Sequence, residues 1–266
     1  MRCRSSLGSC RAVRARMGEL LARWSPPVVS LEARGNCILG ALPQEEFRRV
    51  STDLRMVHLS QGTVLYEWLT VTDEILFPTS AIVSMVTLME DGQSVESVLA
   101  GVDTISGAWV ACGVHRAPWR VVVQSAGHAF AMDTAMFSEH LAASPVLRRL
   151  VLRAAVAGHF LTSQSVGCNR FHDLASRAAR WLLMVVERTG STQVRLTQEF
   201  LSQMLGAHRP SVTVALGVLE HRGLIARTRR GIIDVLDIEA LEGASCECYR
   251  KVREYSARML DLDAPL

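Results

Sequence analysis

The spacing of apolar residues changes along the chain and separates two kinds of structure. Between residues 62 and 132, apolar residues occur in short runs separated by turn signals. Asp91-Gly92 is the strongest of these signals and predicts a hairpin. A series of short strands is typical of a jelly roll or barrel. The expected strands cover residues 62–67, 75–78, 81–89, 93–99, 119–125 and 128–132, the last two as a pair around Gly127.

Helical spacing begins at about residue 133. A short helix is expected over residues 133–139, and Ser144-Pro145 then starts a long one. Along the long helix, apolar and small residues recur at intervals of three and four, the pattern of a coiled-coil seam. This seam can pack against a second copy of the chain or against the chain's own strands. Its residues are Leu147, Leu150, Ala154, Ala157 and Leu161, and the repeat continues to Gln164 and Cys168.

Residues 196–223 predict two short helices around a tight turn, after a helix over residues 174–188 that Asp173 can cap. Thr197 can cap the first short helix, and Gly206 can end it, because glycine takes the left-handed conformation without steric cost. Pro210 can open the second, where its missing N–H is no loss. That helix has an apolar face and an opposite face of small and polar residues. Such a helix can enter a DNA major groove. An ordinary helical hairpin is the alternative.

A basic hairpin is expected directly after these helices. Residues 223–227 and 232–236 predict two strands, and residues 228–231 predict the turn between them. Arg227, Arg229 and Arg230 cluster around this turn. A solvated charged turn is one interpretation. Beside a helix-turn-helix, the arginines are better explained as a wing that contacts DNA phosphates.

The segment LTQEFLSQMLG-x-x-RPSVTVAL-x-x-LEHRGLI with its hairpin resembles the winged helix-turn-helix of the Crp/Fnr family of bacterial transcription regulators. The resemblance implies that Arg209 reads a guanine edge and that the Ser211 hydroxyl contacts a phosphate. Pro210 and Val214 stand where the best-known pattern has glutamate and arginine, so a different operator is expected. The expected DNA-binding residues are Thr197, Gln198, His208, Arg209, Pro210, Ser211, Thr213, Val214, Arg227, Arg229 and Arg230.

The N-terminal strands resemble the cyclic-nucleotide-binding β-roll of the same family, most closely in the FPTSAIVS segment at residues 77–84. The family's nucleotide pocket has a glutamate for the ribose and an arginine for the cyclic phosphate. The corresponding run at residues 105–109 has no carboxylate, and Pro118 interrupts the later run between Arg116 and Arg120. We therefore expect an unknown small effector that is not a cyclic nucleotide.

Together these patterns predict an α+β protein with an N-terminal β-roll (jelly-roll) effector domain, a long dimerisation helix and a C-terminal winged helix-turn-helix. The expected partners are double-stranded DNA, a second copy in a parallel homodimer, and RNA polymerase. Met17 is a plausible start, which leaves open whether residues 1–16 are native. The expected parts are a basic, disordered tail at 1–35, the β-roll at 36–143, the dimerisation helix at 144–168, the DNA-binding domain at 169–242 and a helical extension at 243–266.

Composition adds limits to this interpretation. The formal net charge is only +3, so DNA binding depends on local basic patches. No apolar run approaches about 18 residues, so no membrane span is expected. His58, His115 and His128 are isolated and do not make the ligand set of a metal-dependent jelly-roll enzyme, which argues against an enzyme.

The seven cysteines occur without a secretory signal, which favours reduced thiols in a cytoplasm. Cys3, Cys10 and Cys37 are too far apart to match the N-terminal iron–sulfur cluster of sensors in this family. Cys246 and Cys248 are expected on one helix, where they would point roughly 200° apart. We therefore predict no metal and no cofactor. The alternative function is redox sensing through Cys112 or Cys168.

Overall fold

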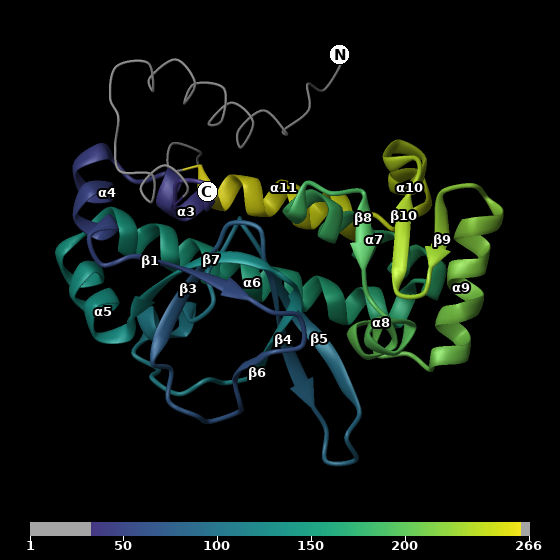
Figure 1. Ribbon diagram of the computed structural model, residues 1–266, viewed down its shortest axis with the longest axis horizontal. Helices are drawn as coiled ribbons and strands as arrows, with labels where there is room; N and C mark the ends of the chain where they lie inside the picture. Colours follow the sequence, from purple (N-terminus) through teal and green to yellow (C-terminus); the bar gives the residue numbers. More distant parts are fainter. Residues whose placement is uncertain (1–32, 262–266) are drawn as a thin grey trace.

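Two antiparallel sheets form the N-terminal half of the part that the computed structural model describes, residues 33–261 (Figure 1). Strands β1, β7 and β3 make one sheet, and β2, β6, β4 and β5 make the other. The large side chains of Phe77 and Phe130 are fully buried on neighbouring strands of the first sheet. The strands are β1 (Arg55–Leu59), β2 (Val64–Tyr66), β3 (Glu74–Pro78), β4 (Ile82–Leu88), β5 (Ser94–Ala100), β6 (Arg120–Ser125) and β7 (Gly127–Asp133).

The predicted pairing around Gly127 is wrong. Strand β6 pairs with β2 and β4, whereas β7 pairs with β1 and β3, so the chain changes sheets between them. Gly127 allows this change, because a Cβ there would lie 2.5 Å from the backbone nitrogen of Ala81. The sequence analysis also missed β1, whose first four residues are exposed or half-buried and give no apolar run.

Helices surround one end of this roll. They are α3 (Cys37–Gly40), α4 (Gln44–Ser51), the 3₁₀ helix η2 (Ala108–Cys112), α5 (Thr134–Ala143) and α6 (Pro145–Phe171). The predicted start of α6 is confirmed: the Ser144 hydroxyl accepts a hydrogen bond from the Leu147 amide at 3.0 Å, and Pro145 opens the helix. No helix within residues 33–261 combines the length and apolarity that crossing a membrane requires.

The predicted seam of α6 faces the chain itself. Leu147, Leu150, Ala154 and Leu161 are at most 4% exposed in the single chain, and α6 contacts η2, β5 and α5. Ala157 is half-buried. This burial corrects the assignment of Leu147, Leu150, Ala154 and Leu161 to a dimer interface, because the chain's own fold already covers them. A different face of α6 is open to solvent.

The C-terminal half holds α7 (Leu174–Thr189), β8 (Gln193–Arg195), α8 (Gln198–Leu205), α9 (Arg209–His221), β9 (Ile225–Arg229), β10 (Ile232–Val235) and α10 (Ile238–Ala244). Helix α7 is buried along most of its length, and α9 and α10 pack against it. Strands β8, β10 and β9 form a small sheet, of which β8 was not predicted. The predicted α+β fold, with a β-roll before a winged helix-turn-helix, is confirmed.

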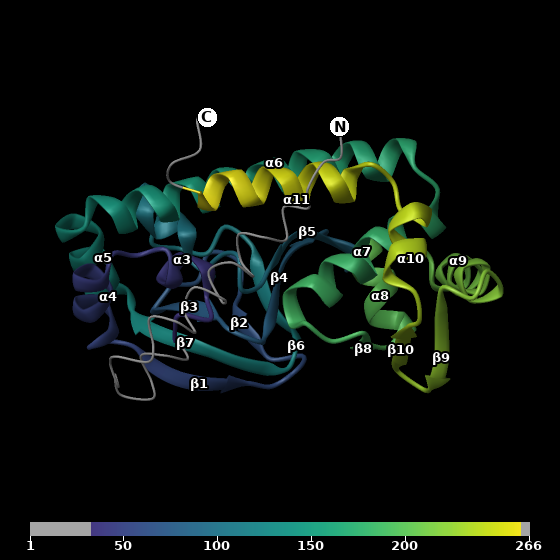
Figure 2. The same cartoon turned by 90° about the horizontal axis from the view of Figure 1, so that it is seen from above.

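The last helix, α11 (Cys248–Leu260), runs back along α6 (Figure 2). The rings of Phe160 and Tyr255 stack between the two helices, with centroids 4.2 Å apart. Helix α11 begins at Cys248, so Cys246 lies before it. The expectation that Cys246 and Cys248 share one helix is therefore wrong. The expectations for residues 1–32, including Met17, Cys3 and Cys10, lie outside the described residues.

Polar contacts from three side chains join the C-terminal half to the roll. The Arg188 guanidinium donates to the Asp103 carboxylate at 2.7 and 3.1 Å. The Trp181 indole donates to Glu96 at 3.1 Å. The Gln61 amide donates to the Arg195 carbonyl at 3.0 Å. These contacts come from α7 and β8, so they leave α9 and the wing free at the far edge of the molecule (Figure 1).

Candidate DNA-binding surface

Local chemistry fixes the turn between α8 and α9. The Thr197 hydroxyl accepts the Phe200 amide at 3.1 Å and caps α8. Gly206 ends α8 with a φ of 55°, in the left-handed region. Leu201, Met204 and Leu205 are buried, so the turn is anchored to the core.

Helix α9 buries one face and presents the other to solvent. Val212, Leu216 and Leu219 are at most 1% exposed. The Thr213 hydroxyl donates to the Gln198 side chain at 3.1 Å, which ties α9 to the start of α8. The exposed face carries five of the eleven predicted DNA-binding residues and extends beyond them. Its residues are Arg209, Pro210, Ser211, Thr213, Val214, Val218 and His221, with His208 just before the helix.

The wing is a tight hairpin with a two-residue turn. Strand β9 continues to Arg229, so the turn is Arg230-Gly231, shorter than predicted. Gly231 has a φ of 79°, which suits glycine. The Thr228 hydroxyl donates to Asp234 at 2.5 Å and braces the two strands. Arg229 and Arg230 are exposed at the tip.

Arg227 differs from the other two arginines. Its backbone amide donates to the Glu220 carboxylate at 3.1 Å and its Nε donates at 2.9 Å. These hydrogen bonds from Arg227 lower the pKa of Glu220. Arg227 therefore joins the wing to α9, and its expected contact with a phosphate stays a prediction. Glu220 was missed, because its spacing from Arg227 across a turn gives no sequence signal.

The start of α8, the start of α9 and the wing enclose a hollow of about 630 Å³. Thr197, Gln198, Arg209, Arg227, Arg229 and Arg230 line it. Glu199, also in its lining, lies 3.8 Å from Arg209 and is 62% exposed. The fold thus brings together residues that are up to 33 positions apart, between Thr197 and Arg230, on one basic surface. Such a surface suits a polyanion.

Solved structures of bacterial regulators share this fold. FixK2 from Bradyrhizobium japonicum matches with a TM-score of 0.62 and 11% identity, over 73% of this chain and 98% of that chain. A protein from Eubacterium rectale, described as a transcriptional regulator of the Crp/Fnr family, matches with a TM-score of 0.59 and 17% identity, over 76% and 94%. CLP from Xanthomonas campestris, described as a c-di-GMP responsive global regulator, matches with a TM-score of 0.58 and 14% identity, over 73% and 100%.

A family model described as the Crp-like helix-turn-helix domain matches residues 176–244. The C-terminal part of the chain therefore contains a Crp-like helix-turn-helix domain. The match covers the segment from α7 to α10 and leaves α11 outside. No curated protein sequence matches the chain. The exposed face of α9 lies within the matched domain and is the candidate surface for reading DNA.

In the β-roll, three aromatic rings gather at Trp109, in the run where the nucleotide pocket was expected. The Trp109 indole donates to the Thr72 hydroxyl at 3.0 Å, and its ring lies 6.1 and 6.0 Å from the rings of Tyr66 and Trp119. The two arginines considered for an anion have other partners. Arg116 donates to the Leu69 carbonyl at 2.7 Å, and Arg120 lies 3.2 Å from Glu67.

The two candidate redox thiols lie in different settings. Cys112 is exposed at the end of η2. Cys168 is 2% exposed near the end of α6, and its Sγ lies 3.5 Å from the Sγ of Cys246. Among the described residues, Cys168 has another thiol close by, that of Cys246, and Cys112 has none.

Proposed function

We propose that this protein is a homodimeric, sequence-specific regulator of the Crp/Fnr type that reads double-stranded DNA with α9 and holds the backbone with its wing. The observation that carries the proposal is the shared surface of Arg209, Arg229 and Arg230 around one hollow. Arg209 is 61% exposed at the first residue of α9, where a guanidinium can bind guanine O6 and N7 together. Arg229 and Arg230 at the wing tip meet phosphates.

The remaining surface residues support this division. Ser211 offers a hydroxyl and a helix-start amide to a phosphate. Thr213 and Val214 face outward one turn further along α9, where they can touch base edges or the thymine methyl group. Arg227 positions the wing through Glu220. Contact with RNA polymerase is part of the proposal, since a regulator acts on transcription by helping or blocking that enzyme.

The proposed dimer uses the open face of α6. Leu152, Val156, His159, Ser163 and Val166 recur at intervals of four and three along this face, the spacing of a coiled-coil seam. Val156 and Val166 are 50% and 67% exposed, so both side chains are available to a second copy of α6. A dimer through α6 carries two copies of α9. It should therefore prefer an inverted repeat with half-sites about one helical turn apart.

The proposed effector is not a cyclic nucleotide. The support is the run at residues 105–109 without a carboxylate, together with the engaged Arg116 and Arg120. A titration calorimetry experiment with cyclic AMP and cyclic GMP should show no heat of binding. Micromolar binding of either compound would contradict this part of the proposal.

Thiol oxidation is a second candidate for regulation, and the 3.5 Å between the Cys168 and Cys246 sulfurs favours Cys168 over Cys112. The test compares DNA binding before oxidation, after it, and after reduction. Cys168→Ser should abolish any change in DNA affinity on oxidation, whereas Cys112→Ser should leave that change as in the wild type. Equal DNA affinity in all three states would exclude this candidate.

The main proposal is tested by selecting bound duplexes from a random DNA pool with the full chain. We expect an inverted repeat to emerge, and Arg209→Ala to relax one base pair in each half-site. Arg250→Ala is the matched control, because Arg250 is 57% exposed on α11, away from the surface. A pool without enrichment, from protein shown to be folded, would contradict sequence-specific DNA binding.

A further inference from the structure

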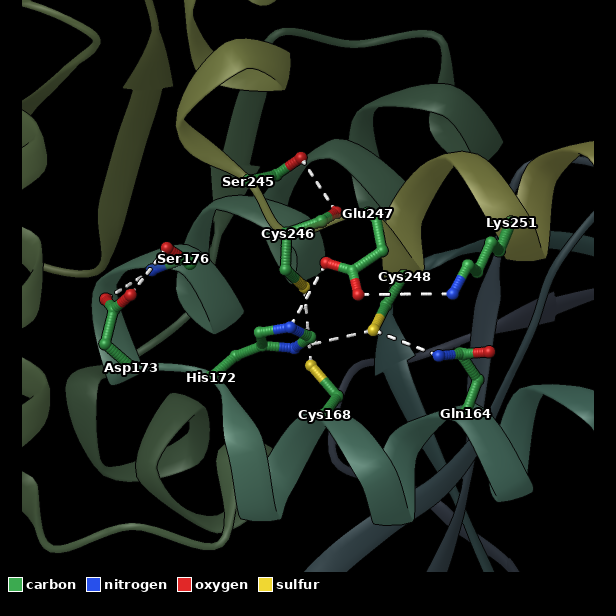
Figure 3. A network of polar contacts seen from close by, with 10 residues as sticks. All are labelled: Gln164, Cys168, His172, Asp173, Ser176, Ser245, Cys246, Glu247, Cys248 and Lys251. Atoms are coloured by element: carbon green, nitrogen blue, oxygen red, sulfur yellow. Dashed lines mark hydrogen bonds and ion pairs between the residues drawn. The ribbon is translucent and has the colours of Figure 1, made fainter.

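Four side chains with metal-binding atoms converge where α6 ends and α11 begins (Figure 3). The sulfurs of Cys168, Cys246 and Cys248 and a ring nitrogen of His172 all lie within 4.8 Å of one another. The three cysteines are buried and the histidine is half-buried. They come from sequence positions almost 80 residues apart, since Cys168 and Cys246 are separated by 78 residues.

The local backbone explains how each pair faces the same point. Cys168 and His172 are one turn apart at the end of α6, and the His172 amide donates to the Cys168 carbonyl at 3.1 Å. Cys246 lies in the short connection between α10 and α11, and α11 begins two residues later at Cys248. A helix boundary between two cysteines lets both sulfurs turn to one side, which a continuous helix would prevent.

We propose that Cys168, His172, Cys246 and Cys248 bind one zinc ion in a tetrahedral site. Three thiolates and one imidazole form a ligand set that zinc takes in closed structural sites. Cys168 Sγ lies 3.5 Å from Cys246 Sγ, and Cys248 Sγ lies 3.6 Å from His172 Nδ1. Two sulfurs on one tetrahedral zinc are about 3.8 Å apart, because each Zn–S bond is about 2.3 Å long. The longest separation of 4.8 Å would shorten by about 1 Å.

The groups around the four ligands suit this role. His172 directs Nδ1 at Cys248, while its Nε2 lies 3.1 Å from the Glu247 carboxylate. A ligand histidine in a metal site commonly donates its second N–H to a carboxylate in this way, which fixes the ring and its tautomer. The Gln164 amide donates to Cys248 Sγ at 3.2 Å, a bond that stabilises a thiolate.

The charge of the site is also balanced. A zinc ion with three thiolates carries one net negative charge. Arg177 and Arg180 line the same small cavity as Cys168 and supply positive charge beside it. Arg180 is buried and is held by a hydrogen bond to the Ser165 hydroxyl at 2.9 Å. A buried arginine next to the ligands favours a negatively charged complex over three neutral thiols.

The position of the site gives the ion a structural task. His172 ends α6, and Asp173 then caps α7 by accepting the Ser176 amide at 3.0 Å. The ion therefore holds the turn from the long helix into the DNA-binding domain. It also holds the first turn of α11, which lies outside the Crp-like domain. Loss of the ion should loosen α11 first.

The test measures zinc in the full-length protein purified under reducing conditions. We expect one zinc per chain and, after exchange for cobalt(II), the visible spectrum of tetrahedral cobalt with thiolate ligands. Cys168→Ser and Cys248→Ser should each weaken zinc binding by more than tenfold in competition with a chelator. Cys112→Ser is the matched control and should bind zinc like the wild type, because Cys112 is exposed and far along the chain from the cluster.

A milder variant keeps the test valid if the cysteine variants misfold. Glu247→Gln retains all four ligands, and should weaken zinc binding by about 10–100-fold through the His172 ring. Chelation of wild-type protein should raise hydrogen exchange in α11 more than in the β-roll. Reduced protein that takes up no zinc would overturn the proposal. Purified protein that contains iron and acid-labile sulfide instead of zinc would also overturn it. A Cys168–Cys246 disulfide that forms again in the presence of added zinc would overturn it too.

Discussion

Glu96 lies where β5 meets α7, and its surroundings favour the neutral carboxylic acid. Burial raises the pKa of Glu96 to about 7, although the hydrogen bond from Trp181 and the charges of Arg180 and Arg188 act in the opposite direction. The group is half-buried between the β-roll and the DNA-binding domain. Its protonation therefore affects the contact between the two halves of the molecule.

The hydrogen bonds around Ser84 support the neutral form independently. The Ser84 hydroxyl lies 2.6 Å from Glu96 Oε2 and 2.8 Å from Gln124 Oε1. Both neighbours are acceptors when Glu96 is ionised, yet a hydroxyl has one proton to donate. A protonated Glu96 donates to Ser84, and Ser84 then donates to Gln124. This arrangement satisfies all three groups, and Ser84 and Gln124 are at most 2% exposed.

The sign of the pH dependence follows from the raised pKa. The folded state binds the Glu96 proton more tightly than the unfolded state, whose value is near 4.5. The stabilisation from this group is complete below pH 4.5, falls as the pH rises to about 7, and is lost above it. Each unit of pKa corresponds to 1.36 kcal/mol, so the change over this window is about 3 kcal/mol at most.

The substitution Glu96→Gln tests this reasoning. Glutamine keeps an acceptor for Trp181 and a donor for Ser84, but it does not titrate. Urea unfolding at fixed protein concentration, between pH 5 and 8, should show the variant gaining up to about 3 kcal/mol relative to the wild type as the pH rises. Glu90→Gln, at the exposed end of the same hairpin, should follow the wild type. Parallel pH profiles for Glu96→Gln and the wild type would refute the reasoning.

Two further predictions concern DNA and assembly. Arg209→Ala should weaken binding to the selected duplex by about 1–3 kcal/mol and relax the sequence preference at one base pair per half-site. Arg229→Ala should weaken binding to all duplexes alike and lower the slope of log affinity against log salt concentration by about one. Fluorescence anisotropy at several salt concentrations measures these affinities and distinguishes the two variants. If Arg209→Ala loses equal affinity for specific and scrambled DNA, Arg209 contacts a phosphate and not a base. The double variant Val156→Lys, Val166→Lys should sediment as a folded monomer. Leu150→Lys should instead destabilise the chain, because Leu150 is 0% exposed inside it. A dimer that survives both valine substitutions would exclude this face of α6.

Features set by neighbouring residues could be predicted from the sequence. Asp173 and Thr197 cap their helices as expected, the long helix starts at Ser144-Pro145, and Gly206 ends α8 in the left-handed conformation. Each of these depends on one side chain and the backbone within three residues of it, so no knowledge of the fold is needed. The order of β-roll, long helix and winged helix-turn-helix followed from such local signals and from the family resemblance.

Features set by distant residues could not be predicted. The three-four repeat of Leu147, Leu150 and Leu161 correctly marks a buried face, but a partner helix and the chain's own roll satisfy the same pattern. The pairing of Arg227 with Glu220 depends on how the wing folds back on α9. The cysteine cluster depends on a helix boundary lying at Cys248 rather than at Cys246, a shift of two residues that reverses the geometric argument.

The position of α11 connects the proposed zinc site with the proposed dimer. Helix α6 has one flank on the β-roll and another on α11, which leaves the face with Val156 and Val166 for a second chain. The zinc site holds the first turn of α11, and the Phe160–Tyr255 stack holds its middle. Without the ion, α11 has fewer contacts to keep it on α6, and apolar surface such as Phe160 would become exposed beside the dimer face. Zinc removal should therefore change the self-association of the chain, which sedimentation of chelated and zinc-restored protein can measure. If the dimer has the same dissociation constant in the chelated and the zinc-restored protein, α11 stays in place without the metal.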